Sequence, residues 1–243
     1  MYLSEIFRQL AVGEIYNISL GGEGCKGVPV SDYPMLVAHV NLGLTELYKR
    51  FPLRMRSLVL ARQPDMAHYR LHSDYAVNNS GSVQPVRYIL DTPENPFQDD
   101  ILKVEKITNP ADNSVVPLND PHSALSLHTS EYDVIEWQYA ADENPVLMLD
   151  QVIISYKAKP DQILADSDLQ PYLVEVRLPD SLLEALLLYI GSRIHTNLNI
   201  DGSMGEGNNY YGKFEAACKK VENLGLLDYP APHNIKLEMR GWV

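Results

Sequence analysis

The segment from Leu182 to Leu198 constrains the fold of this chain more than any other feature. Apolar side chains recur there at three- and four-residue spacing, and they cover more than one face of the expected helix. A helix of this kind is stable only where other elements bury it on more than one side. Its apolar run contains Glu184 and is far shorter than the roughly 20 residues that a membrane span needs. The rest of the chain must therefore supply packing partners for it.

Three other segments carry one apolar stripe at helical spacing and predict amphipathic helices. They span residues 3–10, 32–51 and 210–224. Gly13 and Pro52 follow the first two segments as helix terminators. A glycine-bearing loop, residues 199–207, precedes the third segment, in which Glu215 and Lys219 are spaced for an i,i+4 ion pair.

The middle of the chain differs in character from both ends. It is rich in β-branched and aromatic residues, in short runs that Pro, Asn, Asp and Gly separate, which is typical of strands. The turn-forming residues 109–113 lie between two such runs and predict a hairpin. The expected strands are residues 58–60, 67–75, 86–90, 101–108, 114–118, 132–139, 151–158 and 172–176.

The order of these elements predicts an α+β fold. Two N-terminal and two C-terminal helices form a four-helix core, and an antiparallel β region is inserted between the two pairs. The expected boundaries place residues 1–57 and 177–228 in the helical core and residues 58–176 in the β region. Residues 229–243, with two prolines near their start, predict an extended docking tail.

The composition limits the class of function. The chain has 20 Lys and Arg against 32 Asp and Glu, a formal net charge of -12. A nucleic-acid reader needs a basic face, so this charge argues against that class and favours protein partners. Cys25 and Cys218 are too few for a disulfide framework and predict buried thiols in a reducing compartment. Residues 1–10 predict a short helix and not a secretory signal, and no segment predicts a membrane span.

Two short motifs suggest catalysis or cofactor binding, and neither has the right context. Gly22–Gly27 matches the G-x-G-x-x-G pattern of dinucleotide-binding loops. In that fold the glycines open a helix, whereas here Pro29 intervenes and the helix begins only near Asp32. We interpret the stretch as a surface loop. Ser203 lacks the first glycine of a nucleophile elbow, because position 201 is Asp.

Histidines and carboxylates give no stronger signal. His68 and His72 have metal-like spacing on a helix, but the residues around them alternate as in a strand. On a strand the two imidazoles would stand about 13 Å apart, too far for one zinc ion. The pairs Asp99–Asp100 and Asp142–Glu143 could supply acid and base chemistry, but in expected loops they are better interpreted as solvated charge. The sequence thus predicts no catalytic residue, no metal site and no cofactor.

Positive charge gathers after the second expected helix in an otherwise acidic chain. This group could face phosphates or an acidic neighbour. It could equally balance the dipole of the helix and the edge of a strand. Its members are Lys49, Arg50, Arg54, Arg56 and Arg62.

A family pattern runs along most of the chain, in the order helix, helix, β insertion, helix, helix. The segments that carry it are residues 3–14, 41–51, 101–107, 115–119, 152–160, 176–195 and 211–221. In this order the chain resembles the head-to-tail adaptor (neck or connector) proteins of short-tailed bacteriophages. The glycine-rich residues 21–27 have no role in that family that we can assign.

The resemblance implies a structural protein of the virion neck that is assembled in the host cytoplasm. Such a subunit forms a homo-oligomeric ring of twelve below the portal protein, extends the DNA channel and gives the tail or nozzle protein a platform. Double-stranded DNA passes through the channel without sequence-specific binding, which suits the acidic chain. The resemblance also implies portal docking through the C-terminal segment. The expected anchors are Met239, Arg240, Trp242 and Val243.

A ring subunit must bury apolar surface against its neighbours, and the over-apolar helix is the expected seam. The residues predicted at that oligomer interface are Leu182, Leu186, Tyr189, Ile190 and Ile194. Two alternatives stay open. One is another tail, baseplate or fibre-attachment structural protein with the β region as its main body. The other, with less support, is a cytosolic hydrolase with an acidic site, because catalysis needs convergent groups that this sequence does not display.

Overall fold

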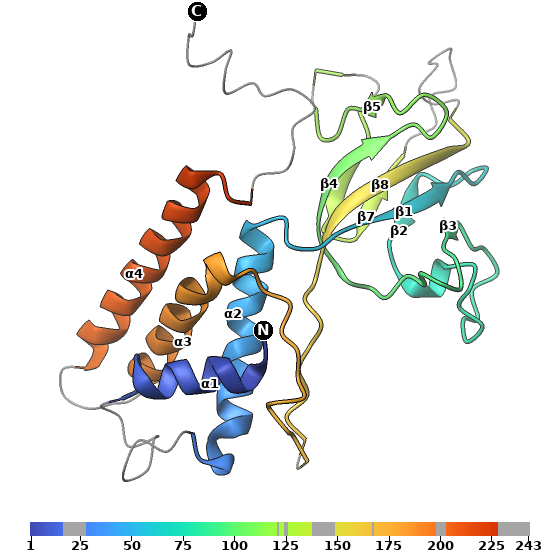
Figure 1. Cartoon of the computed structure of the whole chain (residues 1–243). Helices are drawn as coiled ribbons and strands as arrows, with labels where there is room; N and C mark the ends of the chain where they lie inside the picture. Colours follow the sequence, from blue (N-terminus) through green and yellow to red (C-terminus); the bar gives the residue numbers. More distant parts are fainter. Residues whose placement is uncertain are drawn as a thin grey trace, which may run out of the picture. The chain divides into compact units, whose positions relative to one another are not determined.

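The computed structural model of the chain divides into two compact units (Figure 1). The helical unit combines Met1–Leu53 with Pro160–Val243, and the β unit is Arg54–Lys159. The residues that the structure describes are 1–16, 28–120, 122–123, 126–137, 149–166, 168–197 and 203–227. The predicted fold class is confirmed, since two N-terminal and two C-terminal helices flank central antiparallel sheets.

The two N-terminal helices follow their sequence signals. Helix α1, Leu3–Val12, ends at Gly13, whose backbone N–H donates to the carbonyl of Gln9. Helix α2, Tyr33–Arg50, has a proline in its first turn and ends on two basic residues. Their positive charge interacts favourably with the negative end of the helix dipole. Both stripes of apolar side chains are buried, which confirms the predicted faces.

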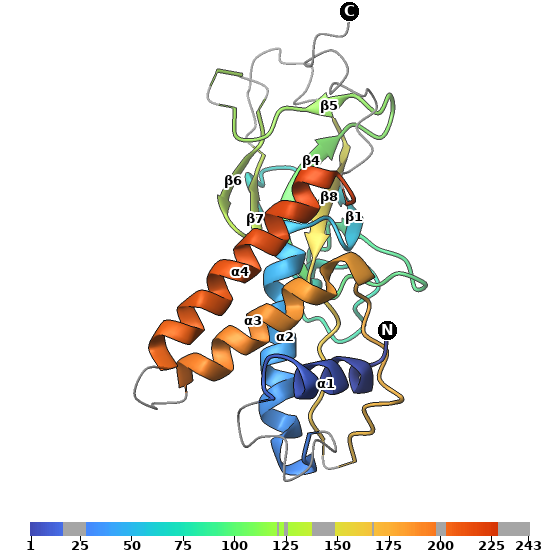
Figure 2. The same ribbon diagram turned by 60° about the vertical axis from the view of Figure 1, so that its left-hand side comes forward.

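The two C-terminal helices are α3, Leu183–Asn197, and α4, Ser203–Leu224. They lie side by side in Figures 1 and 2. Helix α4 starts well before Tyr210, so residues 203–207, expected as part of a loop, are helical. The reason is visible at Gly207, where an added Cβ would lie 3.1 Å from the backbone N of Thr196 and 3.2 Å from the carbonyl O of Ser192. Here glycine allows two helices to approach closely and does not mark a loop.

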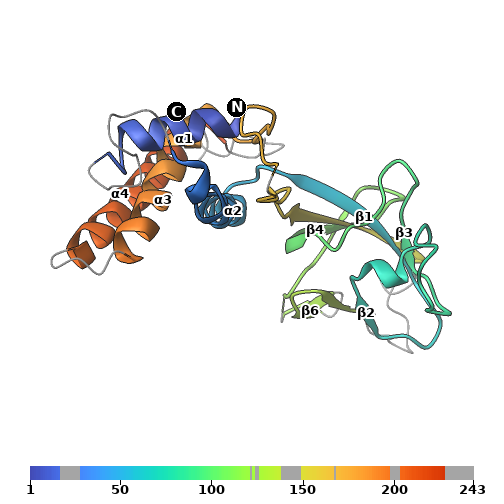
Figure 3. The same ribbon diagram turned by 90° about the horizontal axis from the view of Figure 1, so that it is seen from below.

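The β unit contains two antiparallel sheets that lie as separate layers (Figure 3). The strand order of the larger sheet is β3-β1-β8-β4-β5, and that of the smaller sheet is β2-β7-β6. In the larger sheet the strands are β1 Met55–Ala61, β3 Ile89–Leu90, β4 Ile101–Thr108, β5 Val115–Val116 and β8 Gln151–Ala158. In the smaller sheet they are β2 His68–Arg70, β6 His128–Glu131 and β7 Val134–Glu136.

The register of the strands confirms part of the predicted pattern and corrects part of it. The hairpin around residues 109–113 is confirmed, because Ile107 pairs with Val116. The expected strand 67–75 is strand only in β2, and a 3₁₀ turn, Ser73–Tyr75, follows it. Apolar side chains from both sheets form one buried core, which includes Leu60, Ile107 and Ile154 of the larger sheet and Tyr69 and Ile135 of the smaller one.

The segment after β8 belongs to the helical unit, although the sequence placed residues up to 176 in the β region. The side-chain amide of Asn41 donates to the carbonyl of Ile163 and accepts from its N–H, at 2.9 and 3.0 Å. The predicted strand 172–176 is wrong, because its ladder contact is a single bridge between Tyr2 and Glu175. This segment instead accepts backbone hydrogen bonds from the start of α1, such as Leu3 N to Val174 O at 2.9 Å.

Some sequence expectations fall outside the described residues. These are the glycine-rich residues 21–27, which include Cys25, the pair Asp142–Glu143, and the tail 229–243 with all four expected portal anchors. Within the described ranges, no helix is long and apolar enough to cross a membrane.

Candidate functional site

Helix α3, the expected subunit seam, is the buried centre of the helical unit. It contacts α1, α2 and α4. Leu182, Leu186 and Ile190 have no exposed surface, and Ile194 and Tyr189 are 3% and 9% exposed. These five residues therefore offer almost no surface to a second subunit, and the expectation of an oligomer interface at them is corrected. The apolar excess of α3 is explained by packing inside the protomer, since three helices of the same chain cover it.

The packing around α3 shows how closely it is enclosed. An added Cβ on Gly43 of α2 would lie 2.6 Å from Cδ1 of Leu186, so only glycine lets α2 approach α3 at this point. On the α4 side, the rings of Tyr189 and Phe214 meet edge to face with centroids 5.3 Å apart. Leu186 and Tyr189, which the sequence predicted to contact a neighbouring subunit, make these contacts within the protomer.

A polar cluster lies where α3, α4 and the turn after α1 meet. His195 is 7% exposed, and its ring stacks on Tyr210 with centroids 4.7 Å apart. The Nε2 atom lies 3.0 Å from the carbonyl O of Glu14, and Nδ1 lies 3.2 Å from Oε2 of Glu206. The partners of His195 lie 181 residues before it in the chain and on a separate helix. No spacing rule could have joined them.

The Glu14 side chain is an unusual member of this cluster. Its Oε2 atom is buried and has no hydrogen-bond partner among the described residues. Burial raises the pKa of Glu14, and the nearby charge of Glu184 adds to the rise while Lys213 opposes it. Lys213 also lies over the Tyr210 ring, with Nζ 5.3 Å from the centroid. The cluster thus holds several titratable groups in a largely buried space.

Arg50 joins the end of α2 to α4. Its Nε and Nη2 atoms donate to the two carboxylate oxygens of Glu222 at 2.6 and 3.1 Å, and Nη1 donates to Glu215 at 2.9 Å. Glu215 therefore contacts Arg50, whereas the sequence paired it with Lys219 on the same helix. The hydrogen bond with Glu222 raises the pKa of Arg50 above its ordinary value. We name this set, Arg50 with Glu215 and Glu222, the Arg50 clamp.

Cys218 lies on α4 and is fully buried. Burial raises the pKa of its thiol to about 11. A thiol with so little thiolate at neutral pH is a poor nucleophile, so Cys218 acts as an apolar core residue. The expectation of a buried thiol is confirmed for this cysteine.

In the β unit, Asp100 is buried and not solvated as the sequence suggested, whereas its neighbour Asp99 is partly exposed. Asp100 is 7% exposed, accepts a hydrogen bond from the Tyr156 hydroxyl at 2.9 Å and pairs with Arg56 at 2.8 Å. Burial, and then the charge of Asp100, raise the pKa of Tyr156. A buried ion pair with a further hydrogen bond satisfies both charges, which explains how a carboxylate is tolerated here.

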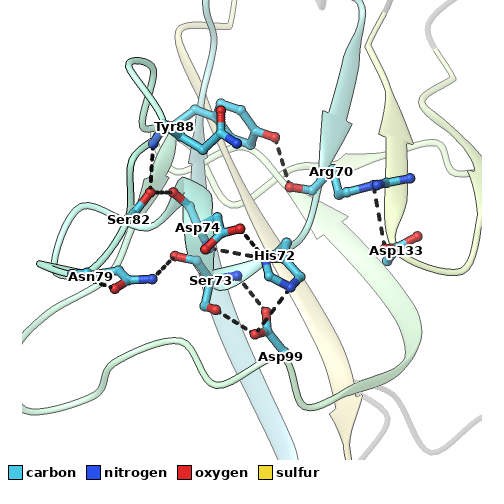
Figure 4. Close-up of polar contacts among 11 residues, drawn as sticks. Arg70, His72, Ser73, Asp74, Asn79, Ser82, Tyr88, Asp99 and Asp133 are labelled. Carbon is cyan, nitrogen blue, oxygen red and sulfur yellow. Dashed lines mark hydrogen bonds and ion pairs between the residues drawn. The ribbon is translucent and has the colours of Figure 1, made fainter.

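A second network in the β unit surrounds the 3₁₀ turn after β2 (Figure 4). Asp99 accepts from the backbone N and the hydroxyl of Ser73, both at 2.5 Å. His72 lies between two carboxylates, with Nε2 3.8 Å from Asp99 and Nδ1 3.4 Å from Asp74. Asp99 has a positive φ of 57°, so this loop is held in a shape that few residues adopt.

The chemistry of this network favours a structural role. The Ser73 hydroxyl and its backbone N–H both donate to Asp99, so this carboxylate closes the turn on itself. His68 is on β2 and its exposed side chain lies 3.7 Å from Glu136, so it does not join His72. Among the described residues, no three His, Cys, Asp or Glu side chains are placed to hold a metal ion. The network pins the turn Ser73–Tyr75 to the loop before β4.

The chain matches no protein-family model, and no curated protein is significantly similar to it.

Proposed function

We propose that this chain is a structural virion protein, a head-to-tail adaptor of a short-tailed bacteriophage. Its subunits form a ring below the portal protein, extend the DNA channel and provide the attachment platform for the tail or nozzle protein. The proposal assigns no catalytic step to the chain. In this proposal the helical unit and the β unit act by binding other proteins through complementary surfaces.

One observation carries this proposal: both ends of the chain build one helical unit, and the β unit is inserted between them. The insertion begins and ends at neighbouring residues, because the Ala158 N–H donates to the Arg54 carbonyl at 2.9 Å. This is the order of elements on which the resemblance to the adaptor family rests. An inserted unit of this kind can vary in its contacts without disturbing the helices that carry it.

The charge distribution supports a channel that does not hold DNA. In the basic group after α2, the Arg50 clamp and the Arg56–Asp100 pair direct guanidinium groups at carboxylates of the same chain. Arginines that are already paired gain less from a phosphate than free ones do. Together with the net charge of -12, this favours weak, sliding contact with DNA.

The ring requires a subunit contact outside the five α3 residues. Large apolar side chains on the surface of the helical unit are available for it. Tyr2, Tyr172 and Leu173 are 54%, 61% and 68% exposed, and backbone hydrogen bonds join the segments that carry them. Exposed apolar residues are common on protein surfaces, so exposure alone does not identify the subunit contact. The assembly experiment identifies it.

The decisive experiment mixes the purified full chain with portal rings from the phage that encodes it. We expect a stoichiometric complex in which a ring of this chain covers one end of the portal, visible by negative-stain electron microscopy. Twelve copies per portal ring by mass photometry would match the resemblance. Absence of any complex with the portal would refute the proposal.

A truncated chain separates the adaptor from the alternative of a tail or fibre-attachment protein. Removal of residues 229–243 should abolish portal binding if the expected anchors, Met239, Arg240, Trp242 and Val243, dock on the portal. A protein that attaches fibres through the β unit should keep its partner after the same truncation. The circular dichroism spectrum of both chains serves as the control for folding.

A further inference from the structure

A segment of the helical unit exposes large apolar side chains among acidic ones. Residues 161–175, which we name the acidic segment, contain four Asp and Glu and no Lys or Arg. Leu164, Tyr172 and Leu173 are each more than half exposed. Tyr2 is also exposed, and backbone hydrogen bonds join its segment to the acidic segment. Large apolar side chains that are exposed on neighbouring segments are typical of an interaction site.

Helix α4 has a basic side that points away from its core contacts. Phe214 and Cys218 are buried, whereas Lys213, Lys219 and Lys220 are exposed. Lys213 and Lys220 are seven residues apart and so lie on one side of the helix, with Lys219 next to them. We name these three lysines the lysine face. The outer side of α4 therefore carries positive charge in an otherwise acidic chain.

Two further features of α4 leave the lysine face ready for a partner. Glu215 and Glu222 do not cancel its charge, because both are bound to Arg50 in the Arg50 clamp. At Gly212, beside the lysines, nothing lies within 4 Å of an added Cβ, so the described residues leave this point of the helix uncovered. Lysine stems can cover apolar side chains while their ammonium groups reach carboxylates. The lysine face thus suits a partner that is both apolar and acidic.

The two surfaces lie on opposite flanks of the helical unit. Figures 1 and 2 show α4 on one flank and the gold-coloured acidic segment on the other, with α2 and α3 between them. One copy of the chain therefore cannot bring its own two surfaces together. Neighbouring copies can, because the lysine face of one copy is complementary in charge to the acidic segment of the next.

We propose that the acidic segment of one copy docks on the lysine face of a second copy of this chain. The ammonium groups meet the carboxylates of Asp166, Asp168 and Glu175, and Tyr172 and Leu173 pack on the lysine stems. Such a contact joins two different patches, so it repeats from copy to copy and closes into a ring where the rotation allows. The inference rests on the proposed function and deepens it, because the adaptor ring needs a subunit contact.

The net charge supports a second copy as the occupant. With a formal charge of -12, the chain repels its own copies at long range. A cationic face opposite an acidic one replaces that repulsion by attraction at one orientation and fixes the register of the contact. The apolar side chains of the acidic segment then add the buried area that a charged contact alone lacks.

Two double variants of the full chain test the contact, and each reverses the charge of one surface. The first is Lys219→Glu with Lys220→Glu, and the second is Asp166→Lys with Asp168→Lys. Sedimentation velocity measures association of the free chain, and mass photometry counts the copies on each portal ring. We expect each double variant to associate with itself at least about tenfold more weakly than the unaltered chain.

An equal mixture of the two double variants should assemble again. The reversed lysine face of one variant meets the reversed acidic segment of the other, and their unaltered surfaces form the original contact. A misfolded variant could not restore assembly, so the mixture also controls for folding. A mixture that associates no better than its components would overturn the inference.

Lys103→Glu with Lys106→Glu is the matched control, because it changes the net charge equally at two exposed lysines of β4 in the β unit. It should associate like the unaltered chain. An equal loss in this control would overturn the inference, since net charge and not the contact would then govern association.

The remaining outcomes separate the contact from the proposed function. Portal rings that carry as many copies of each double variant as of the unaltered chain would overturn the contact and leave the adaptor function standing. If the lysine variant lost portal binding but kept its self-association, the lysine face would belong to the portal and the inference would be wrong. An unaltered chain that self-associates, is restored by the mixture and ignores the portal would support the contact and refute the adaptor function.

Discussion

At the scale of single residues, glycines on the same helix have different roles. An added Cβ at Gly207 would press on the backbone of α3, including Thr196 N at 3.1 Å. At Gly212, on the same helix, nothing lies within 4 Å of such a Cβ. The packing of α4 on α3 gives the two glycines these different roles.

This difference predicts opposite outcomes for the same substitution. Gly207→Ala should destabilise the chain by about 1–3 kcal/mol, because neither helix backbone can move aside cheaply. Gly212→Ala should stabilise it by up to about 1 kcal/mol, since alanine is the better helix former. Urea unfolding followed by circular dichroism measures both. Equal effects from the two alanines would mean that α3 and α4 do not pack as described.

His39 is the second residue whose behaviour the fold determines. It is 8% exposed, and its Nδ1 atom is buried with no hydrogen-bond partner among the described residues. Burial, and then the charge of Arg193, lower the pKa of His39. A histidine that resists protonation in the folded state favours unfolding once the pH falls below its unfolded value of about 6.5.

We therefore expect acid to weaken the chain through His39. The urea midpoint should fall between pH 7.5 and pH 5.5, and His39→Leu should reduce that fall because the buried group can no longer take up a proton. The contribution of His39 is the difference between the pH dependence of this variant and that of the unaltered chain. A fall as large in His39→Leu as in the unaltered chain would contradict this account.

At the scale of elements, the Arg50 clamp fixes the end of α2 to α4. Arg50 is the last residue of α2, and its two carboxylate partners are seven residues apart on α4. The pairing is partly exposed, with 24% of the Arg50 side chain accessible, so solvent reduces its strength. Its two-oxygen contact with Glu222 gives it more geometric specificity than a single contact would.

Arg50→Met keeps the aliphatic stem and removes the charge, so it isolates the clamp. We expect a loss of about 1 kcal/mol in the free energy of unfolding, and a smaller loss in high salt because the pairs are screened. Lys49→Met is the matched control on the preceding residue, whose ion pair with Glu46 lies within α2 and is more exposed. It should change the stability by less than about 0.5 kcal/mol.

At the scale of the whole molecule, the β unit has the features of an independent domain. Strands β1 and β8 pair along their full length, from Met55 with Lys157 to Ala61 with Gln151. The two ends of the unit are therefore neighbours in its own sheet. Its core draws on both sheets, and Trp137 is 2% exposed within it.

We expect residues 54–159 to fold when expressed alone. The fluorescence of Trp137, the one tryptophan of this fragment, should show a buried indole that becomes exposed in a single transition on urea addition. The same transition should appear in the full chain after Trp242→Phe removes the other tryptophan. A fragment that shows solvent-exposed emission without denaturant would mean that the β unit needs the helices to fold.

The sequence by itself determined the elements and their class. Apolar spacing located α1, α2 and α3, and strands β4 and β8 agree with their expected residues, because these signals are local and each needs only its own segment. It could not locate the start of α4 or the partners of the charged residues. Gly207 is typical of a loop in the sequence, but in the fold it lets two helix backbones approach closely.

Only the tertiary structure decided what the apolar helix packs against and which polar groups meet. The same pattern in α3 fits a subunit seam or a protomer core, and the answer depends on three other helices. Asp100 was interpreted as solvated, yet it pairs with Arg56 of a distant strand, and His195 meets Glu14 from the other end of the chain. Burial and charge pairing are properties of the folded chain, because they arise where segments far apart in sequence exclude water together.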